Sequence, residues 1–362
     1  MLGFVFLILC YMGANVWLAY KAISYFSFLP KWGRWLIVVG FIFFTFAMPL
    51  MILGRSFHVP LFLWEHPYYW LSTGWMVFVL YMVLLLLLGD LLHRFIIRIP
   101  HRFPMALGLT ALILIVGHVH FRNPVVQTLS LDLTKPATEG RMRVVAVSDV
   151  HLGYGITKKR LQEFVVQINE QKPDVVLISG DLIDAIVDPL REHHMEEELA
   201  RINAPLGIYM ALGNHEYISG IEESLDFIAT TPIHLLRDQI VLLPNGVQIV
   251  GRDDRTNTNR KSLPELLQAV DHSKPIFLLD HQPEDQEVAE AIASRVDFAF
   301  YGHTHNGQVW PGNWLIKNLF KYGYGYYQEG ITHIYTSSGL GLWGPPFRVG
   351  TESELLVVDF SL

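Results

Sequence analysis

Clusters of carboxylate, amide and imidazole residues follow a series of short apolar runs in the later part of this 362-residue chain. Each apolar run has the length and composition of a β-strand. The clusters are Asp149-Val150-His151, Gly180-Asp181, Gly213-Asn214-His215, a solitary His281 and Gly302-His303-Thr304-His305. Because each cluster stands directly after a strand, we expect these side chains to gather along one edge of a sheet.

The donor atoms in these clusters indicate a metal site. They combine carboxylate, carboxamide and imidazole without thiolate, a set that suits Mn, Fe, Zn or Ni, among which we favour Mn. There are enough residues for two divalent ions. Two ions about 3.5–4 Å apart need a shared ligand, and a carboxylate serves best because its charge offsets the repulsion between them. Asp181 is the candidate bridging residue.

The order D-x-H, G-D-x-x-D, G-N-H-E, H, G-H-x-H resembles the calcineurin-like metallophosphoesterase superfamily, from about Met142 to Leu362. The resemblance implies an α/β fold of two mixed β-sheets flanked by helices, with the site at the loop edge. It implies that one ion is held by Asp149, His151 and His305, that the other is held by Asn214, His281 and His303, and that Asp181 bridges them.

The resemblance also implies two catalytic residues. His215 would face the substrate phosphate and protonate the leaving oxygen or stabilise charge on it, and Asp184 would orient His215. A carboxylate behind an imidazole fixes its tautomer and raises its basicity. The ions would lower the pKa of a bridging water and neutralise the phosphoryl oxygens, so the reaction is hydrolysis of a phosphoester or phosphoanhydride bond.

Two of these assignments have alternatives. His281 stands alone after an apolar run, and neighbouring Asp280 or His272 could be the donor instead. Asp184 could be a helix-capping residue after the Gly-Asp turn.

Other segments indicate a branch of the superfamily. Ala185-Ile186 stands where protein Ser/Thr phosphatases carry Arg-Gly after Asp, which argues against that class. Gly302–Gln308 and the Gly-rich stretch Ser337–Phe347 are similar to the membrane-associated bacterial branch of YkuE-type phosphodiesterases, in which some relatives cleave UDP-2,3-diacylglucosamine. Asn306 departs from the Gly of that branch's G-H-T-H-G-G-Q, so the substrate is not carried over.

The front of the chain is too apolar for an ordinary soluble domain. The chain is 51% hydrophobic with a mean hydropathy of +0.30, and the excess precedes the first motif. Four stretches each approach the ~20 residues that cross a bilayer as a helix. They are Leu2–Tyr20, Trp35–Leu53, Trp70–Gly89 and Pro104–Phe121. We therefore predict transmembrane helices in 1–121, a polar linker in 122–141 and a catalytic domain in 142–362.

Basic residues in the short loops predict an orientation, because cytoplasmic loops carry an excess of Lys and Arg. The first and third loops hold Lys21, Lys31, Arg34, Arg94, Arg98 and Arg102, whereas the other side holds Arg55 and Arg122. Both termini and the catalytic domain should then lie outside the inner (plasma) membrane. The sole cysteine, Cys10, lies in the first span, so no intramolecular disulfide can form.

From Met142 onward the pattern alternates between strands and helices, which is typical of a sheet with helices on its faces. A hairpin at Ile240–Leu243 and Val247–Arg252 indicates a change to antiparallel strands. The other predicted strands are Arg143–Ser148, Asp174–Ser179, Leu206–Leu212, Ile276–Leu279, Phe298–Tyr301, Ile331–Thr336 and Glu354–Phe360, and the predicted helices lie near Lys158–Glu170, Pro189–Ile202 and Pro283–Ala293.

An aromatic segment, Trp310–Tyr327, follows the last ligand block. It could contact the bilayer or an acyl chain, or it could be a folded flap on the domain core. The formal net charge of −7 and the lack of a basic stripe disfavour nucleic acid as the main partner. Up to +4 from two divalent ions would still dominate locally toward an anionic substrate.

The sequence thus predicts a membrane-anchored dinuclear metal-dependent phosphoesterase that acts on a membrane-associated or envelope substrate, with the lipid bilayer and lipid-linked phosphoesters as partners. One alternative is a UDP-2,3-diacylglucosamine pyrophosphatase-like hydrolase if the domain is cytoplasmic. Another is a non-catalytic membrane-tethered scaffold, although such a protein should have lost ligands or His215, and all are present. The spans should be an anchor, because Asp90 alone, at the edge of a span, is poor support for a translocation path.

Overall fold

The computed structural model describes residues 2–56, 65–138 and 140–362. The chain divides into two compact units, which are described separately. The first comprises Met1–Val119 together with Gly344–Val349, and the second comprises His120–Trp343 together with Gly350–Leu362.

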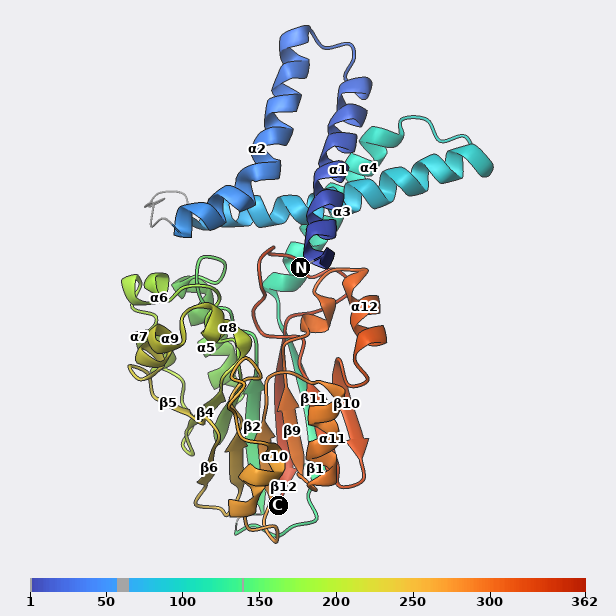
Figure 1. Cartoon of the computed structure of the whole chain (residues 1–362). Coiled ribbons are helices and arrows are strands. Elements are labelled where there is room, and N and C mark those ends of the chain that lie inside the picture. The colour runs from blue at the N-terminus through green and yellow to red at the C-terminus, as the bar shows by residue number, and fades with distance from the viewer. Residues whose placement is uncertain (1, 57–64, 139) are drawn as a thin grey trace. The chain divides into compact units, whose positions relative to one another are not determined.

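Long apolar helices make up the first unit (Figure 1). They are α1 (Leu2–Tyr25), α2 (Lys31–Ser56), α3 (Glu65–Phe95) and α4 (Arg102–Arg122). In the described residues, four helices are long and apolar enough to cross a membrane. They coincide with the four predicted stretches, and each extends past the predicted bounds.

Polar contacts join these helices inside the first unit. The indole Nε1–H of Trp75 on α3 donates to Oδ1 of Asn15 on α1, at 2.8 Å. Asp90 near the end of α3 pairs with Lys21 on α1 at 2.7 Å and with Arg102 on α4 at 2.8 Å. Asp90 is therefore neutralised by two cations, which agrees with a structural role at a helix end.

Gly344–Val349, although late in the sequence, packs within the first unit. The main-chain N–H of Arg348 donates to the carbonyl of Gly117 on α4 at 2.9 Å, and that of Gly344 donates to the hydroxyl of Tyr69 on α3 at 3.1 Å. A Cβ on Gly117 would lie 2.7 Å from Cγ2 of Val349. The close approach of this segment to α4 therefore depends on glycine at position 117.

Two six-stranded mixed β-sheets form the centre of the second unit, which confirms the predicted fold class (Figure 1). The first sheet has the order β1 (Val125–Asp132), β12 (Glu354–Ser361), β2 (Arg141–Val147), β3 (Val175–Ser179), β4 (Ile208–Ala211), β5 (Ile233–Leu235). The second has the order β10 (Gly325–Glu329), β11 (Thr332–Thr336), β9 (Phe298–Tyr301), β8 (Ile276–Leu279), β7 (Gln248–Gly251), β6 (Gln239–Leu242). The predicted hairpin is the antiparallel pair β6 and β7.

Strand β1 lies in the segment that the sequence assigned to a linker. It pairs in parallel with β12 from Val125 opposite Glu354 to Asp132 opposite Ser361. Pro124 and Pro136 flank the strand. The strand was not predicted, because proline usually marks turns and loops. As an edge strand, β1 has only Leu131 buried.

Short helices cover the sheets. They are α5 (Lys158–Glu170), α6 (Asp188–Glu192), α7 (Glu196–Leu199), α8 (Asn214–Ile218), α9 (Ile221–Ile228), α10 (Leu263–Leu266), η1 (Leu267–Ala269), α11 (Asp285–Ala293), η2 (His305–Gly307) and α12 (Gly312–Leu319). Helix α5 buries Leu161, Phe164, Val165 and Ile168, the spacing of one helical face. The single helix predicted near 189–202 is wrong: α6 and α7 are separate, because His194 between them takes a left-handed φ of 49°.

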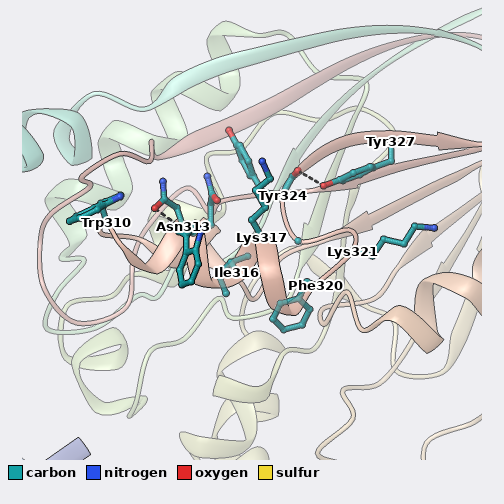
Figure 2. A pocket seen from close by; sticks show the side chains of 11 residues that line it. Trp310, Asn313, Ile316, Lys317, Phe320, Lys321, Tyr324 and Tyr327 are labelled. Atoms are coloured by element: carbon teal, nitrogen blue, oxygen red, sulfur yellow. Dashed lines mark hydrogen bonds between the residues drawn. The ribbon is translucent and has the colours of Figure 1, made fainter. Parts of the chain in front are cut away.

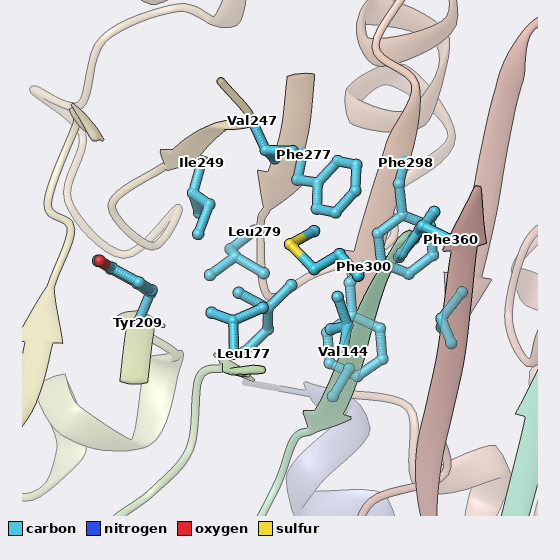
Figure 3. Close-up of a cluster of buried hydrophobic side chains, with 14 of the residues drawn as sticks. Val144, Leu177, Tyr209, Val247, Ile249, Phe277, Leu279, Phe298, Phe300 and Phe360 are labelled. Atoms are coloured by element: carbon cyan, nitrogen blue, oxygen red, sulfur yellow. The ribbon is translucent and has the colours of Figure 1, made fainter. Parts of the chain in front are cut away.

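The main core lies between the two sheets. Figure 3 shows Val144 and Leu177 of the first sheet gathered with Phe277, Phe298 and Phe300 of the second. These strands are buried on both faces, since helices cover their outer sides, so they read as continuous apolar runs rather than alternating ones. That burial makes the strand ends rigid platforms for the loops that follow them.

Candidate metal centre

Every predicted ligand lies just after the carboxyl end of a strand. Strands β2, β3 and β4 run parallel in the first sheet, and β7, β8 and β9 run parallel in the second. The residues that follow them are Asp149 and His151 after β2, Asp181 after β3, Asn214 and His215 after β4, His281 after β8, and His303 and His305 after β9. The loops from both sheets converge on a common group of side chains.

Asp149, His151 and His305 form one group of donors. One ligand atom from each lies within 4.8 Å of the other two. Nε2 of His305 is 3.4 Å from Oδ1 of Asp149 and 3.1 Å from Nε2 of His151. The three residues are those that the family resemblance implies for a single ion.

Asp181, His281 and His303 form another group with the same spacing. Oδ2 of Asp181 is 3.0 Å from Nε2 of His281. The amide oxygen of Asn214 is 2.9 Å from Nδ1 of His303, so it belongs to the same side of the cluster. Oδ2 of Asp181 is also 3.8 Å from Nε2 of His151 in the other group. The Asp181 carboxylate therefore stands between the two groups, where a bridging ligand must lie.

The structure distinguishes His281 from its alternatives. The imidazole of His281 is fully buried within the donor group. Asp280 instead pairs with Arg252 at 3.0 Å and with Arg260 at 3.4 Å, and His272 is exposed.

His215 lies beside the donors, on the first turn of α8. Its main-chain N–H donates to Oδ1 of Asp181 at 2.8 Å. Ring atom Nδ1 contacts the main-chain carbonyl of Asp184. Because a carbonyl oxygen can only accept, Nδ1 carries the hydrogen, which leaves Nε2 to exchange a proton.

Asp184 approaches two imidazoles with its carboxylate. Its Oδ1 is 3.9 Å from Nδ1 of His215 and 3.4 Å from Nδ1 of His151. The contact that orients His215 most closely is therefore the carbonyl of Asp184 rather than its carboxylate. The capping alternative is wrong for the helix that follows, since α6 begins at Asp188 and Val187 is its N-cap residue.

Charge within the group is concentrated and buried. Burial acts to raise the pKa of Asp181, but the charges of His281, His151 and His215 reverse this and hold it well below its ordinary value. Burial acts to lower the pKa of His281, and the charges of Asp181 and Asp149 outweigh it, so the pKa lies well above the ordinary value. Without other cations, protons on the imidazoles must compensate the carboxylates.

This charge pattern fits divalent cations. A buried carboxylate group requires positive charge, and metal binding supplies it while releasing the protons from the imidazoles. Within the described residues, the buried Nε2 of His281 has no hydrogen-bond partner, although it is 3.0 Å from Asp181. An unsatisfied imidazole nitrogen beside an ionised carboxylate is the arrangement expected for two ligands of a shared ion.

The ligand loops have an unusual backbone. Asp149, His151, Asp181, His303 and His305 have φ values of 52°, 52°, 53°, 72° and 50°. Non-glycine residues rarely occupy this left-handed region, and such conformations concentrate at functional sites. The tight turns aim the donors back toward one another directly after each strand.

Two motif glycines allow the loops to approach the carboxylates. A Cβ on Gly213 would lie 2.2 Å from Oδ1 of Asp181, and a Cβ on Gly302 would lie 2.4 Å from Oδ2 of Asp149. Any side chain at either position would displace a predicted ligand.

Glu216 is a buried residue to which the sequence assigned no role. Its carboxylate accepts main-chain N–H groups of Asp181 at 3.1 Å, Ile183 at 3.0 Å and Gly213 at 2.8 Å. Burial, with the charge of Asp181, raises the pKa of Glu216 to about 7. Glu216 thus ties the loop after β3 to the loop after β4. Its position as the last letter of G-N-H-E was the signal that could have identified it.

A second set of unforeseen residues supports the His281 loop from behind. Arg252 pairs with Asp280, and both Arg252 and Arg260 pair with Glu287. Nearby, the amide of Gln282 donates to Asp254 at 2.8 Å. Dispersed charges of this kind carry no local sequence pattern, because their partners come from different loops.

Comparison with known proteins agrees with the motifs. The model of the calcineurin-like phosphoesterase family matches residues 142–307. An uncharacterized metallophosphoesterase of Campylobacter jejuni is 29% identical, with 98% of this chain and 97% of the relative covered. One of Aquifex aeolicus is 30% identical, with 64% of this chain and 90% of the relative covered. The uncharacterized metallophosphoesterase YkuE of Bacillus subtilis is 29% identical, with 66% and 85% covered.

These relatives confirm both the superfamily and the YkuE likeness that the sequence predicted. The Campylobacter jejuni protein matches over nearly the whole chain, including the apolar helices. The chain therefore belongs to the calcineurin-like metallophosphoesterase family and is a metal-dependent phosphoester hydrolase.

Proposed function

We propose that this protein is a membrane-anchored phosphoesterase with two divalent ions, which hydrolyses phosphodiester or phosphoanhydride bonds of a membrane-associated or envelope substrate. The observation that carries the proposal is the position of Asp181. Its Oδ2 lies 3.0 Å from His281 and 3.8 Å from His151, between two complete donor groups.

In this proposal Asp149, His151 and His305 hold one ion, Asn214, His281 and His303 hold the other, and Asp181 bridges them. Bound divalent ions supply water acidic enough to be ionised near neutral pH and neutralise the phosphoryl oxygens. The oxygen and nitrogen donors suit Mn, Fe, Zn or Ni, and we propose Mn among them.

His215 is the proposed proton donor to the leaving oxygen. Its Nδ1–H is held by the Asp184 carbonyl and its main chain is held by Asp181. These two contacts fix the ring beside the donor groups. The imidazole therefore presents its other nitrogen, Nε2, to a phosphoryl group at the centre.

The convergence of all seven proposed ligands disfavours the scaffold alternative. A protein that no longer catalysed hydrolysis would be expected to have lost some of these donor residues. The lipid A precursor alternative concerns the substrate and depends on sidedness. We propose that the catalytic unit is extracytoplasmic, from the basic residues of the first and third loops.

The test is hydrolysis by purified full-length protein with Mn²⁺. Substrates should include a model diester, a monoester, lipid diphosphates and UDP-2,3-diacylglucosamine. Asp181→Ala should lose bound metal, measured by elemental analysis, together with hydrolysis. His215→Ala should lose hydrolysis while it retains metal.

The matched control is His194→Ala, since His194 is an exposed histidine that pairs only with Glu196 among the described residues. It should keep both metal and activity. Undiminished hydrolysis by Asp181→Ala would reject the proposed centre.

A further inference from the structure

A surface cavity of about 690 Å³ lies in the segment that follows the metal-ligand loop. Figure 2 shows its lining side chains, Trp310, Lys317, Phe320 and Tyr324 among them. Helix α12 and the residues around it form its walls, and Asn306, Trp310, Trp314, Lys317, Phe320 and Tyr324 are among them. Asn306 directly follows the predicted ligand His305. The cavity lining therefore begins at the residue that follows a predicted metal ligand in the chain.

The ligand loop and the cavity wall form one connected piece. The hydroxyl of Thr304, between His303 and His305, donates to the carbonyl of Gly323 at 2.7 Å. Asn306 takes the left-handed conformation, with φ 48° and ψ 33°, and it lines the cavity. A ligand bound in the cavity would therefore be held at a fixed position relative to His305.

Apolar side chains of α12 are exposed both in the cavity and beside it. Trp314, which lines the cavity, is 65% exposed, and Leu315 and Leu319, outside the lining, are 51% and 63% exposed. None of the helix residues, all of which the structure describes, is buried. Tyr322 after the helix is 4% exposed and packs into the core. The segment is therefore anchored as a flap at Tyr322, while α12 keeps an apolar surface that core packing does not explain.

The charge of the cavity is cationic. Its lining residues, all within the described part of the chain, include Lys317 and Lys321 and no Asp or Glu. Lys321 pairs with Glu329 at 3.4 Å. Lys317 has no ion pair among the described residues, so its ammonium group is available to an anion. A phosphorylated molecule with an apolar tail matches both the charge and the surface.

We propose that this cavity is a subsite for the apolar chain of the substrate, which makes phosphoesters of long-chain, lipid-like alcohols the preferred substrate class. The inference rests on the proposed function, because the phosphoryl group must lie at the metal centre. Lys317 holds an anionic oxygen of the substrate, Asn306 lies at the junction with the metal centre, and Trp314 and Phe320 contact the chain.

A homologous series tests this inference. The substrates are p-nitrophenyl phosphodiesters with methyl, butyl and octyl groups, and the enzyme is the full-length protein with Mn²⁺ in nanodiscs without free detergent. Each buried methylene contributes at most about fourfold to binding. We expect kcat/KM to rise by about tenfold or more from the methyl to the octyl ester.

Variants assign the effect to the cavity. Trp314→Ala and Phe320→Ala should each lower the octyl-to-methyl ratio of kcat/KM, by about fivefold or more. Lys317→Gln should raise KM for all three anionic esters and leave the ratio close to that of the native protein. Leu242→Ala removes an apolar side chain of similar exposure, 57%, on β6, outside the cavity. Its octyl-to-methyl ratio of kcat/KM should match that of the native protein. A match shows that losing an exposed apolar side chain elsewhere does not change the ratio, including any part of it that comes from partition of the octyl ester into the bilayer.

The outcomes separate the two proposals. If the native protein with Mn²⁺ hydrolyses none of the three esters and none of the lipid diphosphates or UDP-2,3-diacylglucosamine, the proposed function fails. If it hydrolyses all three with equal kcat/KM, the function stands and the subsite is rejected. A chain-length preference that survives both aromatic substitutions would also reject the subsite. Bound Mn²⁺, measured for each variant, shows that a changed ratio does not come from a lost metal centre.

Discussion

A Cβ on Gly302 would lie 2.4 Å from Oδ2 of Asp149. Real Cβ atoms essentially never lie within 3.0 Å of another heavy atom, so this close approach depends on glycine at position 302. The relationship joins the end of β9 in one sheet to the loop after β2 in the other. At the same place the main-chain N–H of His303 donates to the Asp149 carboxylate at 3.1 Å, which links the two halves of the metal centre.

Gly302→Ala should therefore displace the Asp149 carboxylate and lower metal-dependent hydrolysis, by about a hundredfold, since a shift of about 1 Å in a catalytic group has effects of that size. Initial rates and bound metal measure it. Gly140→Ala is the control, because a Cβ there meets nothing within 4 Å. Native activity with native metal content in Gly302→Ala would contradict the proposed role of Asp149.

Glu216→Gln should destabilise the second unit. Its carboxylate accepts three main-chain N–H groups, and an amide NH₂ in place of one oxygen would face a donor. An unsatisfied buried group costs about 1–3 kcal/mol, which thermal unfolding of the full-length protein would detect. Glu222→Gln is the control, because the side chain of Glu222 on α9 is exposed. Equal unfolding temperatures for the two variants would argue against Glu216 as the link between the two loops.

Stability should depend on pH through Glu354. Burial raises its pKa above the ordinary value, although hydrogen bonds from Ser338 and Tyr324 oppose the shift. A raised pKa in the folded state means that stability is full below the unfolded pKa of about 4.3 and is lost as pH rises through the folded pKa. Glu354→Gln cannot ionise, so it removes this loss.

The measurable quantity is the difference in unfolding temperature between Glu354→Gln and the native protein. As pH rises from about 4 toward neutrality, the unfolding temperature of the variant should rise relative to that of the native protein. The free energy of unfolding that the native protein loses is about 1.4 kcal/mol for each pKa unit between its folded and unfolded states. A difference that stays constant with pH would contradict the raised pKa.

Substitutions in α4 test the packing of Gly344–Val349. Gly117→Leu should destabilise the first unit by about 1–3 kcal/mol through overpacking, because a Cβ at 117 meets Val349 at 2.7 Å. Gly108→Leu lies in the same helix, where a Cβ meets nothing within 4 Å. Unfolding of both variants in nanodiscs should separate them, and similar behaviour would show that the segment does not pack against α4 as described.

The sidedness of the catalytic unit is the fifth prediction. A reporter enzyme that is active only outside the cytoplasm should be active when fused after Leu362, and one that is active only in the cytoplasm should be inactive there. The reason is that the basic first and third loops favour the cytoplasm. Protease treatment of intact and opened cells gives an independent measurement. A cytoplasmic C-terminus would reverse the predicted orientation and favour the lipid A precursor alternative.

The sequence was sufficient for elements with strong local patterns. The four apolar helices and the buried strands Ile276–Leu279 and Phe298–Tyr301 have the predicted positions, since a long or continuous apolar run has few alternatives. Strand β1 was not predicted, because an edge strand flanked by prolines has only a weak apolar pattern. Helices α6 and α7 were predicted as one helix, because a left-handed residue such as His194 leaves no signature in composition.

For the metal centre, the motif order and the family resemblance predicted the candidate donor residues and their grouping, because each metal needs particular atoms and these stand at short, recognisable intervals after strands. Tertiary structure supplied the distances within each predicted group and the position of Asp181 between the groups, since those distances depend on how two separate sheets are placed. It also decided the roles of Glu216, Gly302 and the cavity beside α12. Gly302 and Asp149 are far apart in the chain, and Glu216 joins loops that follow two different strands, so only folding brings these groups into contact.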